Sequence, residues 1–147
     1  MDIAEHRRGA YRITTDKAQL DVPLIHKFLS EESYWATGRT LGTVQTSIDH
    51  SLCFGVFEGA TQVGFARVVT DRATFAWVCD VFILPSHRGL GLAKWLIESV
   101  VSHPAIHGLR LTLLATRDAH GLYERYGGFA PLDNPERWMA KWNRAST

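Results

Sequence analysis

The apolar residues in the first fifty positions of the chain follow a helical spacing. They recur three and four positions apart over residues 24–29, which is the period of one helix face. Asp21 precedes them as a residue that can cap a helix N-terminus, and Pro23 is tolerated in a first helical turn. We therefore predict a helix over about residues 21–32 and a second, short helix over 43–50.

From residue 52 the pattern changes to that of β-strands. The runs 52–57, 62–69 and 74–84 are rich in β-branched and aromatic residues and are separated by turn-length stretches, so three consecutive antiparallel strands are expected. Residues 11–14 alternate between polar and apolar, which favours an edge strand, and the apolar run 109–115 predicts a short buried strand. The centre of the chain is thus expected to be a meander.

Helical spacing returns in the last third of the chain. Apolar residues recur at helical positions over 92–101 and stop before a proline. Residues 119–126 form a shorter helical segment that ends at Gly127 and Gly128. The alternation over 137–142 predicts a last strand.

The predicted elements follow the order β-α-α-β-β-β-α-β-α-β, which indicates an α/β fold with a mixed sheet. The unit of strand, loop, helix and strand over residues 74–115 is long enough for a parallel crossover. Neither a linker nor an internal repeat divides the chain, so we expect a single domain over residues 1–147. The polar residues 1–10 are expected to be flexible.

Composition and charge agree with this fold class and narrow the function. The chain has 147 residues, of which 46% are hydrophobic, and this suits one compact domain. Sixteen basic and fifteen acidic side chains leave a net charge of +1, which argues against a nucleic-acid partner. Neither a membrane span nor a signal peptide is recognisable, and the two cysteines stand apart, as suits a reducing compartment. We expect a cytoplasmic protein with no membrane partner.

The candidate chemistry begins in the loop between the third strand of the meander and the helix that starts near Leu92. Gly89 and Gly91 would let an anion approach the free N–H groups of a helix N-terminus, and Arg88 adds a cation. The loop is neither a dinucleotide fingerprint nor a P-loop, because the third glycine of the first and the Lys-Ser/Thr of the second are absent. The same loop could be a tight turn whose glycines only supply positive φ angles.

Three segments of the chain resemble the GCN5-related N-acetyltransferase (GNAT) family. Arg88-x-x-Gly91-x-Ala93 matches the Gln/Arg-x-x-Gly-x-Gly/Ala motif of this family. Residues 80–85 resemble its acidic and apolar strand end before a proline, and 119–129 resemble its Ala-x-x-Leu-Tyr-Glu segment with the Gly-Phe that follows. The resemblance is strongest over residues 75–130, and the expected order of elements agrees with it along nearly the whole chain.

The resemblance implies acetyl-CoA as the acyl donor and strands that splay around the acyl-CoA site. In the family the pantetheine arm lies in that gap like an additional strand, so backbone groups of Val81, Phe82 and Ile83 would pair with it. Further cofactor contacts are implied for Arg88, Gly89, Leu90, Gly91, Leu92, Ala93, Lys94, Thr116 and Tyr126. Thr116 stands where the family often carries asparagine, and its hydroxyl can still form a hydrogen bond. No metal is expected, because the histidines on either side of Pro104 do not share a helix face.

Two residues are candidates for the proton transfers of amide formation. Tyr123 matches the family tyrosine that protonates the departing thiolate, and its reference pKa of about 10 is near a thiol's at about 8.5; alternatively its ring only packs in the core. Asp80 is a candidate base, because a carboxylate on a central strand is unfavourable unless it is used or paired. The alternative for Asp80 is a local cap or an ion pair with an arginine. Asp118 is expected to cap the short helix.

The family resemblance also implies an amine acceptor. Tyr34, Trp35 and Arg39, between the first two helices, offer aromatic surface and a cation for a small molecule or a peptide. In the alternative arrangement Trp35 covers the core and Arg39 is solvated. The remaining tryptophans are expected in the core or in a subunit interface, and the latter would make the protein a homodimer.

The sequence therefore predicts transfer of an acetyl group from acetyl-CoA to a primary amine by direct attack. A second hypothesis is a regulator that binds acyl-CoA without catalysis, since Leu111 and Leu113 stand where some family members carry a carboxylate. A third hypothesis is an interaction module whose glycine loop is accidental.

Overall fold

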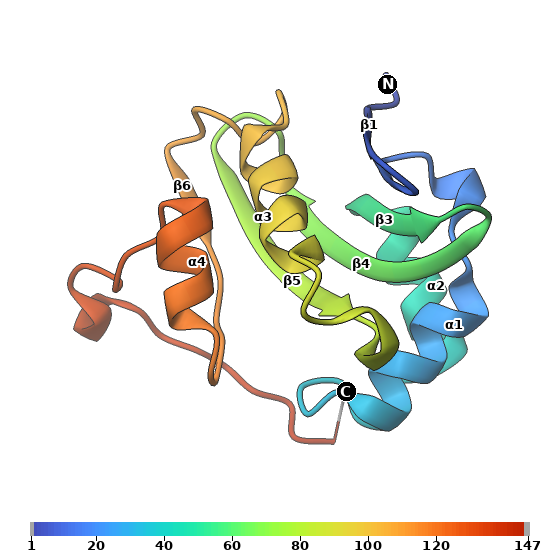
Figure 1. Ribbon diagram of the computed structural model, residues 1–147. Helices are drawn as coiled ribbons and strands as arrows, with labels where there is room; N and C mark the ends of the chain where they lie inside the picture. Colours follow the sequence, from blue (N-terminus) through green and yellow to red (C-terminus); the bar gives the residue numbers. More distant parts are fainter. Residues whose placement is uncertain (1, 146–147) are drawn as a thin grey trace.

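The computed structural model describes residues 2–145 and shows one sheet with helices on both faces (Figure 1). The strands are β1 (Glu5–Arg8), β2 (Tyr11–Thr14), β3 (Leu52–Glu58), β4 (Thr61–Thr70), β5 (Phe75–Ile83) and β6 (Leu111–Leu113). The helices are α1 (Val22–Lys27), which continues into a π-helical turn (Phe28–Glu32), α2 (Leu41–Asp49), α3 (Leu92–Ser102) and α4 (His120–Gly127). Short 3-10 turns cover Lys17–Gln19, Pro85–His87 and Pro135–Arg137. The predicted mixed α/β fold is confirmed.

The strands lie in the sheet in the order in which they occur along the chain. Strands β1 to β5 are antiparallel neighbours, whereas β5 and β6 are parallel and are connected through α3. Pairing between β5 and β6 extends only from Phe75 to Trp77 on β5. The rest of β5 has no strand on that side among the described residues, so the two strands diverge as the family resemblance implies.

Each face of the sheet is covered by its own pair of helices (Figure 1). On one face α3 packs its apolar side onto the meander and α4 packs against α3; this core includes Leu92, Trp95, Leu96, Val100, Phe54, Val63, Ala66 and Val78. On the other face α1 and α2 cover Cys53, Phe65 and Phe82 with Ile25, Leu29, Val44 and Ile48. Burial from both sides explains why β3 and β4 read as continuous apolar runs rather than as alternating ones.

A β-bulge lies close to the point where β5 leaves β6. Phe65 pairs with Phe82 and Arg67 pairs with Cys79, so two residues of β5 oppose Ala66 on β4. One of these two residues, Asp80, has a φ angle of +51° in the left-handed region, which non-glycine residues rarely adopt. The bulge therefore changes the direction of the Asp80 side chain at the point where the divergent part of β5 begins.

Both ends of the chain differ from the predicted order of elements. The N-terminal residues form β1, which is paired with β2 from Glu5 to Arg8 and is held by ion pairs from Arg7 and Arg12 to Glu5. At the other end, residues 137–142 form no strand, because their alternation meets no partner strand at the outer edge of β6.

The tryptophans divide between core and surface. Trp95 is buried, whereas Trp77, Trp138 and Trp142 are exposed. Both cysteines are free thiols. No helix within residues 2–145 combines the length and the apolar character needed to cross a membrane.

Candidate active site

The glycine loop presents an uncapped helix N-terminus. Gly91 is the N-cap residue of α3 with a φ angle of +79°, no side chain caps the helix, and Gly89 has a φ angle of +80°. A Cβ atom at either glycine would meet nothing within 4 Å, so glycine is required by the backbone conformation and not by crowding. The first N–H groups of α3 are consequently free to bind an anion, and the helix dipole favours one there.

Two cations stand beside this N-terminus. Arg88 donates from Nε to the backbone carbonyl of Ile83 at 3.1 Å, which folds its side chain back over the end of β5. Lys94, in the first turn of α3, holds its Nζ atom 4.8 Å from the ring centroid of Tyr126 on α4. The predicted cofactor residues Arg88, Lys94 and Tyr126 therefore lie around the start of α3, while Leu90 is exposed at the loop tip and Leu92 is buried below it.

The divergent part of β5 leads toward this loop. Phe82 and Ile83 pair with Phe65 and Gly64 on β4, and Phe82 stacks on Phe28 at 4.0 Å between ring centroids. On the opposite edge, toward β6, this segment has no strand partner within the described residues. Leu84 N–H donates to the carbonyl of Val63 on β4 at 2.8 Å, and the backbone groups of a strand alternate between its two edges, so those of Phe82 also face β4. Val81 and the N–H of Ile83, whose carbonyl already accepts a bond from Arg88, therefore provide the open backbone groups for an extended ligand.

Tyr123 lies on α4, across the gap between β5 and β6 from the open edge of β5. Its ring packs edge-on against Phe129, with 5.8 Å between centroids, and borders a small apolar cavity with Val81. It also borders a groove of about 1140 Å³ that runs along β6 and α4. Burial, with smaller contributions from Tyr34 and Cys79, raises the pKa of Tyr123 to about 12. The phenol is therefore protonated at neutral pH and can donate.

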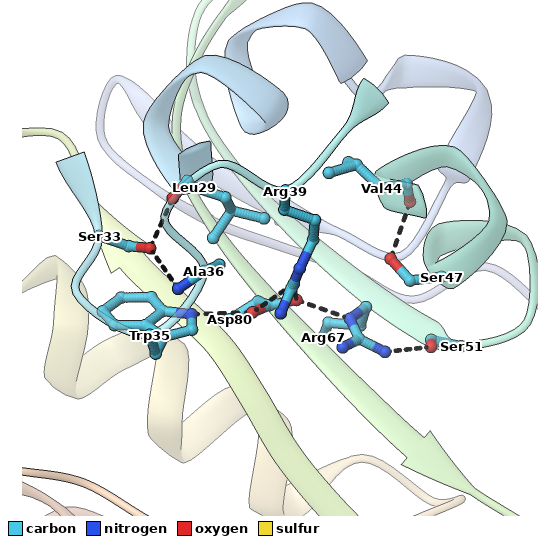
Figure 2. A network of polar contacts seen from close by, with 10 residues as sticks. All are labelled: Leu29, Ser33, Trp35, Ala36, Arg39, Val44, Ser47, Ser51, Arg67 and Asp80. Carbon is cyan, nitrogen blue, oxygen red and sulfur yellow. Dashed lines mark hydrogen bonds and ion pairs between the residues drawn. The ribbon is translucent and has the colours of Figure 1, made fainter. Parts of the chain in front are cut away.

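Asp80 is bound by three side chains, as Figure 2 shows. Its oxygens accept hydrogen bonds from Trp35 Nε1 at 2.8 Å, from Arg39 Nη1 at 3.0 and 3.2 Å, and from Arg67 Nε at 2.8 Å. Arg67 also donates from Nη1 to Ser51 Oγ at 3.1 Å. Of the roles that the sequence leaves open for Asp80, the structure contains the ion pair, and it has two arginines instead of one.

The loop that supplies Trp35 and Arg39 is fixed by its own hydrogen bonds. Ser33 Oγ donates to the carbonyl of Leu29 at 2.6 Å and accepts from the N–H of Ala36 at 3.1 Å (Figure 2). Thr40 then caps α2 through its hydroxyl, which accepts from the N–H of Thr43. The loop is thus held in one conformation over the β5 bulge.

Tyr34 connects this loop to the segment between β6 and α4. Its hydroxyl accepts a hydrogen bond from the backbone N–H of Arg117 at 2.9 Å, and the Arg117 guanidinium stacks 3.9 Å from its ring centroid. Tyr34 also meets Trp35 edge-on, with 5.0 Å between centroids. The three predicted acceptor residues therefore lie in one group, together with Arg117.

The start of α4 differs in detail from the prediction. Ala119 is the N-cap residue, and Thr116 Oγ1 accepts a hydrogen bond from its N–H at 3.2 Å. Asp118 therefore does not cap the helix but pairs with Arg117 at 3.5 Å on the surface. Gly128 ends α4 with a φ angle of +73°, as the glycine pair indicates.

Two cations near the candidate site, Arg67 and Arg117, were not predicted from the sequence. Arg67 was hidden in an apolar strand, although one charge inside the run 62–69 could have signalled a buried partner. Arg117 carried no signal, because its position depends on a contact between loops 83 residues apart in the chain. No group of three or more His, Cys, Asp or Glu residues within 2–145 is arranged to hold a metal ion.

Comparison with known proteins agrees with this geometry. Residues 2–129 match the model of the acetyltransferase (GNAT) family. The chain belongs to this family. A Gibberella zeae protein with a provisional acetyltransferase name, FG08082, is 32% identical over 138 residues, which cover 79% of this chain and 77% of that protein.

Solved structures of GNAT proteins share the fold. A crystal structure from Xanthomonas campestris pv. campestris, of a protein provisionally assigned to the GNAT family, is 49% identical with a TM-score of 0.89, covering 93% of this chain and 96% of that one. The ribosomal-protein-S18-alanine N-acetyltransferase from Escherichia coli is similar in fold, with a TM-score of 0.63 at 19% identity over 80% of this chain and 76% of that one. The family assignment and the fold are therefore consistent over nearly the whole chain.

Proposed function

We propose that this GNAT protein transfers an acetyl group from acetyl-CoA to a primary amine of a small molecule or peptide, with Tyr123 as the general acid. The observation that carries the proposal is the combination of an uncapped α3 N-terminus, an open edge of β5 and a protonated Tyr123 around one gap. Each of these features suits one part of an acyl-CoA: the phosphates, the extended arm and the thioester.

The residues of this site fit two parts of acetyl-CoA, its pyrophosphate and its pantetheine arm. The free N–H groups at Gly91 and in the first turn of α3, with Arg88 and Lys94, would hold the pyrophosphate. The backbone of Val81 and the N–H of Ile83, on the edge of β5 that lacks a strand neighbour, would pair with the amides of the pantetheine arm. Thr116 has its hydroxyl hydrogen left to donate, because the bond from Ala119 uses only its oxygen as acceptor.

The reaction needs one bond formed and one broken. The neutral amine nitrogen attacks the thioester carbonyl carbon, the C–N bond forms, and the C–S bond then breaks with the electron pair on sulfur. The Tyr123 phenol hydrogen-bonds to the sulfur as negative charge develops there. The proton that the amine loses passes to water, and water supplies the proton that the sulfur takes up, so that the free thiol and the amide are the products.

The raised pKa of Tyr123 shapes this step. A phenol with a pKa of about 12 stays protonated throughout the range in which the amine becomes neutral. Complete transfer of its proton to a thiolate with a pKa of about 8.5 would be unfavourable by roughly 5 kcal/mol. As the general acid, Tyr123 therefore stabilises the developing thiolate through a hydrogen bond with partial proton transfer, and water supplies the proton that the thiol finally carries.

Asp80 has a positioning role in this proposal. Its two oxygens already accept hydrogen bonds from Trp35, Arg39 and Arg67, so accepting the amine proton would require it to give up a buried ion pair. It instead holds the loop of Trp35 and Arg39 against the β5 bulge, beside Val81.

Thiol release from acetyl-CoA in the presence of a panel of amines and short peptides tests the proposal, with the acetylated product identified by mass spectrometry. Turnover of at least one amine is expected. Tight binding of acetyl-CoA in calorimetry without turnover of any amine would favour the regulator hypothesis instead. Absence of binding would exclude both and leave an interaction module.

Replacing Gly91 by glutamate should weaken acetyl-CoA binding by about 100-fold or more. The new side chain must adopt a φ angle of +79° and places a negative charge where the phosphates would bind. The dissociation constant is measured by calorimetry. Gly9→Glu is the matched control, because Gly9 also has a positive φ angle, of +56°, but lies in the turn between β1 and β2. Equal losses in both variants would contradict the anion site.

A further inference from the structure

The cluster around Asp80 contains one more positive than negative charge. Arg39 and Arg67 both pair with the single carboxylate of Asp80 (Figure 2). The side chains of Arg39, Arg67 and Asp80 are only 14%, 10% and 2% exposed. Burial opposes the charge of the Arg67 guanidinium, but the ion pair with Asp80 favours it and the net effect raises the pKa of Arg67, so Arg67 is a cation at every working pH. Buried charges are normally balanced by partners. Among residues 2–145, one elementary charge of this cluster has no such partner.

The neighbouring groups do not supply the missing negative charge. Cys53 and Cys79 are the thiols closest to the cluster, and burial raises the pKa of Cys53 to about 11 and that of Cys79 to about 12, so both are neutral. Asp49, at the end of α2, has its carboxylate bonded to Gln45 at 2.8 Å and makes no ion pair with either arginine. The excess charge therefore has no anionic partner among these neighbouring groups.

The unused hydrogen-bonding capacity belongs to Arg39. Both of its bonds to Asp80 use Nη1. Its Nε atom is buried and has no hydrogen-bond partner within residues 2–145. The edge of a guanidinium formed by Nε and Nη2 is a fork that matches a carboxylate or a phosphate in a bidentate manner.

The position of this edge connects it to the reaction. Arg39 binds Asp80, and Asp80 is adjacent to Val81 at the bulge, where the extended arm of the donor would pass. Trp35 and Tyr34, on the same loop, supply the aromatic surface next to it. We infer that the amine acceptor carries an anionic oxygen group, a carboxylate or a phosphate, which pairs with the free edge of Arg39. This inference rests on the proposed acetyl transfer and names the class of its acceptor.

The same charge balance disfavours cationic acceptors. A polyamine or a lysine-rich peptide would add positive charge to a buried cluster that already has an excess of it. An amine with a nearby anionic group would neutralise the cluster. Amino acids with a free carboxylate and aminoalkyl phosphates belong to this class.

Matched pairs of amines test the inference. The first pair is an amino acid and its carboxamide, and the second is aminoethyl phosphate and ethanolamine; acetylation of each is followed by thiol release. In at least one pair the anionic member is expected to have a kcat/KM about 10-fold to 100-fold higher than its neutral partner, the usual range for a charge-assisted bidentate contact. The pair that shows the effect distinguishes carboxylate from phosphate. Equal kcat/KM values within both pairs, or a preference for polyamines, would overturn the inference.

The variant Arg39→Gln separates recognition from folding. It leaves a neutral pair of Arg67 and Asp80, so the fold should be retained, and a thermal melt verifies this. The preference should disappear, so that the anionic amine and its neutral partner have similar kcat/KM values in this variant. Arg39→Lys keeps the charge without the fork and should retain only part of the preference. Arg7→Gln is the control, because Arg7 lies on β1 with 72% of its side chain exposed. Equal losses for both members of a pair in Arg39→Gln would contradict the inference.

A binding measurement that does not depend on turnover distinguishes this inference from the proposed function. Calorimetry of the anionic amine, its neutral partner and inorganic phosphate with the CoA-bound protein measures the Arg39 contact directly. Binding of the anionic amine that is lost in Arg39→Gln would support the anionic class even if no amine were acetylated, in which case only the proposed transfer fails. If neither the anionic amines nor phosphate bind more tightly than the neutral amines, the inference is wrong.

Discussion

Replacing Tyr123 by phenylalanine should lower kcat by about 100-fold or more and leave the dissociation constant of acetyl-CoA unchanged. The substitution removes the hydroxyl that would stabilise the departing thiolate but keeps the ring, which packs against Phe129 and borders the cavity under β5. Losses of this size are usual when a positioned acid is removed. Thiol release at saturating amine gives kcat, and calorimetry gives the dissociation constant.

Two controls make this result specific. Tyr11→Phe removes a phenol from β2, outside the gap between β5 and β6, and should leave kcat unchanged. Because the pKa of Tyr123 is raised to about 12 by burial, the acid stays protonated between about pH 7 and pH 10, so ionisation of Tyr123 should cause no loss of rate there. Unchanged turnover in Tyr123→Phe would remove the acid role. A weaker affinity with unchanged kcat would instead make Tyr123 a packing residue for the donor.

The fold was predictable wherever the pattern of apolar residues had one interpretation. The three strands of the meander and the helices α2, α3 and α4 lie within a few residues of their predicted bounds. The two ends were not predictable, because strand formation there depends on a neighbour. The polar residues of β1 pair with β2, which is already part of the sheet, whereas the alternating residues 137–142 find no partner.

The site was predictable where it depends on a contiguous segment. Residues 88–94 carry the helix start, the positive φ angles and the cations in one stretch of sequence. The surroundings of Asp80 depend instead on a loop and two strands, and Arg39 bonds to it from 41 positions away. A bulge rotates Asp80 toward these arginines, and no local pattern encodes a register shift of this kind. The sequence therefore left the role of Asp80 open.

Replacing Asp80 by alanine should lower the free energy of unfolding by about 3–5 kcal/mol, the usual loss when one partner of a buried ion pair is removed. The Asp80 side chain is 2% exposed, and its removal leaves Arg39 and Arg67 together without a carboxylate. For a domain of this size the melting temperature should fall by roughly 10–16 °C. Chemical denaturation measures the free energy. Asp49→Ala is the matched control, because that carboxylate is exposed and, within residues 2–145, bonds only to Gln45; a change within about 0.5 kcal/mol is expected there.

A second substitution identifies the cause of the loss. If the uncompensated charge is responsible, Arg67→Met in the Asp80→Ala background should recover part of the stability, because it removes one buried cation and fills its space with an apolar side chain. If the lost bond from Trp35 and the loosened loop are responsible, the double variant should be no more stable than Asp80→Ala. The first outcome would show that the charge balance of this cluster contributes to folding. An anionic ligand that supplies the missing charge should then stabilise the wild-type protein as well.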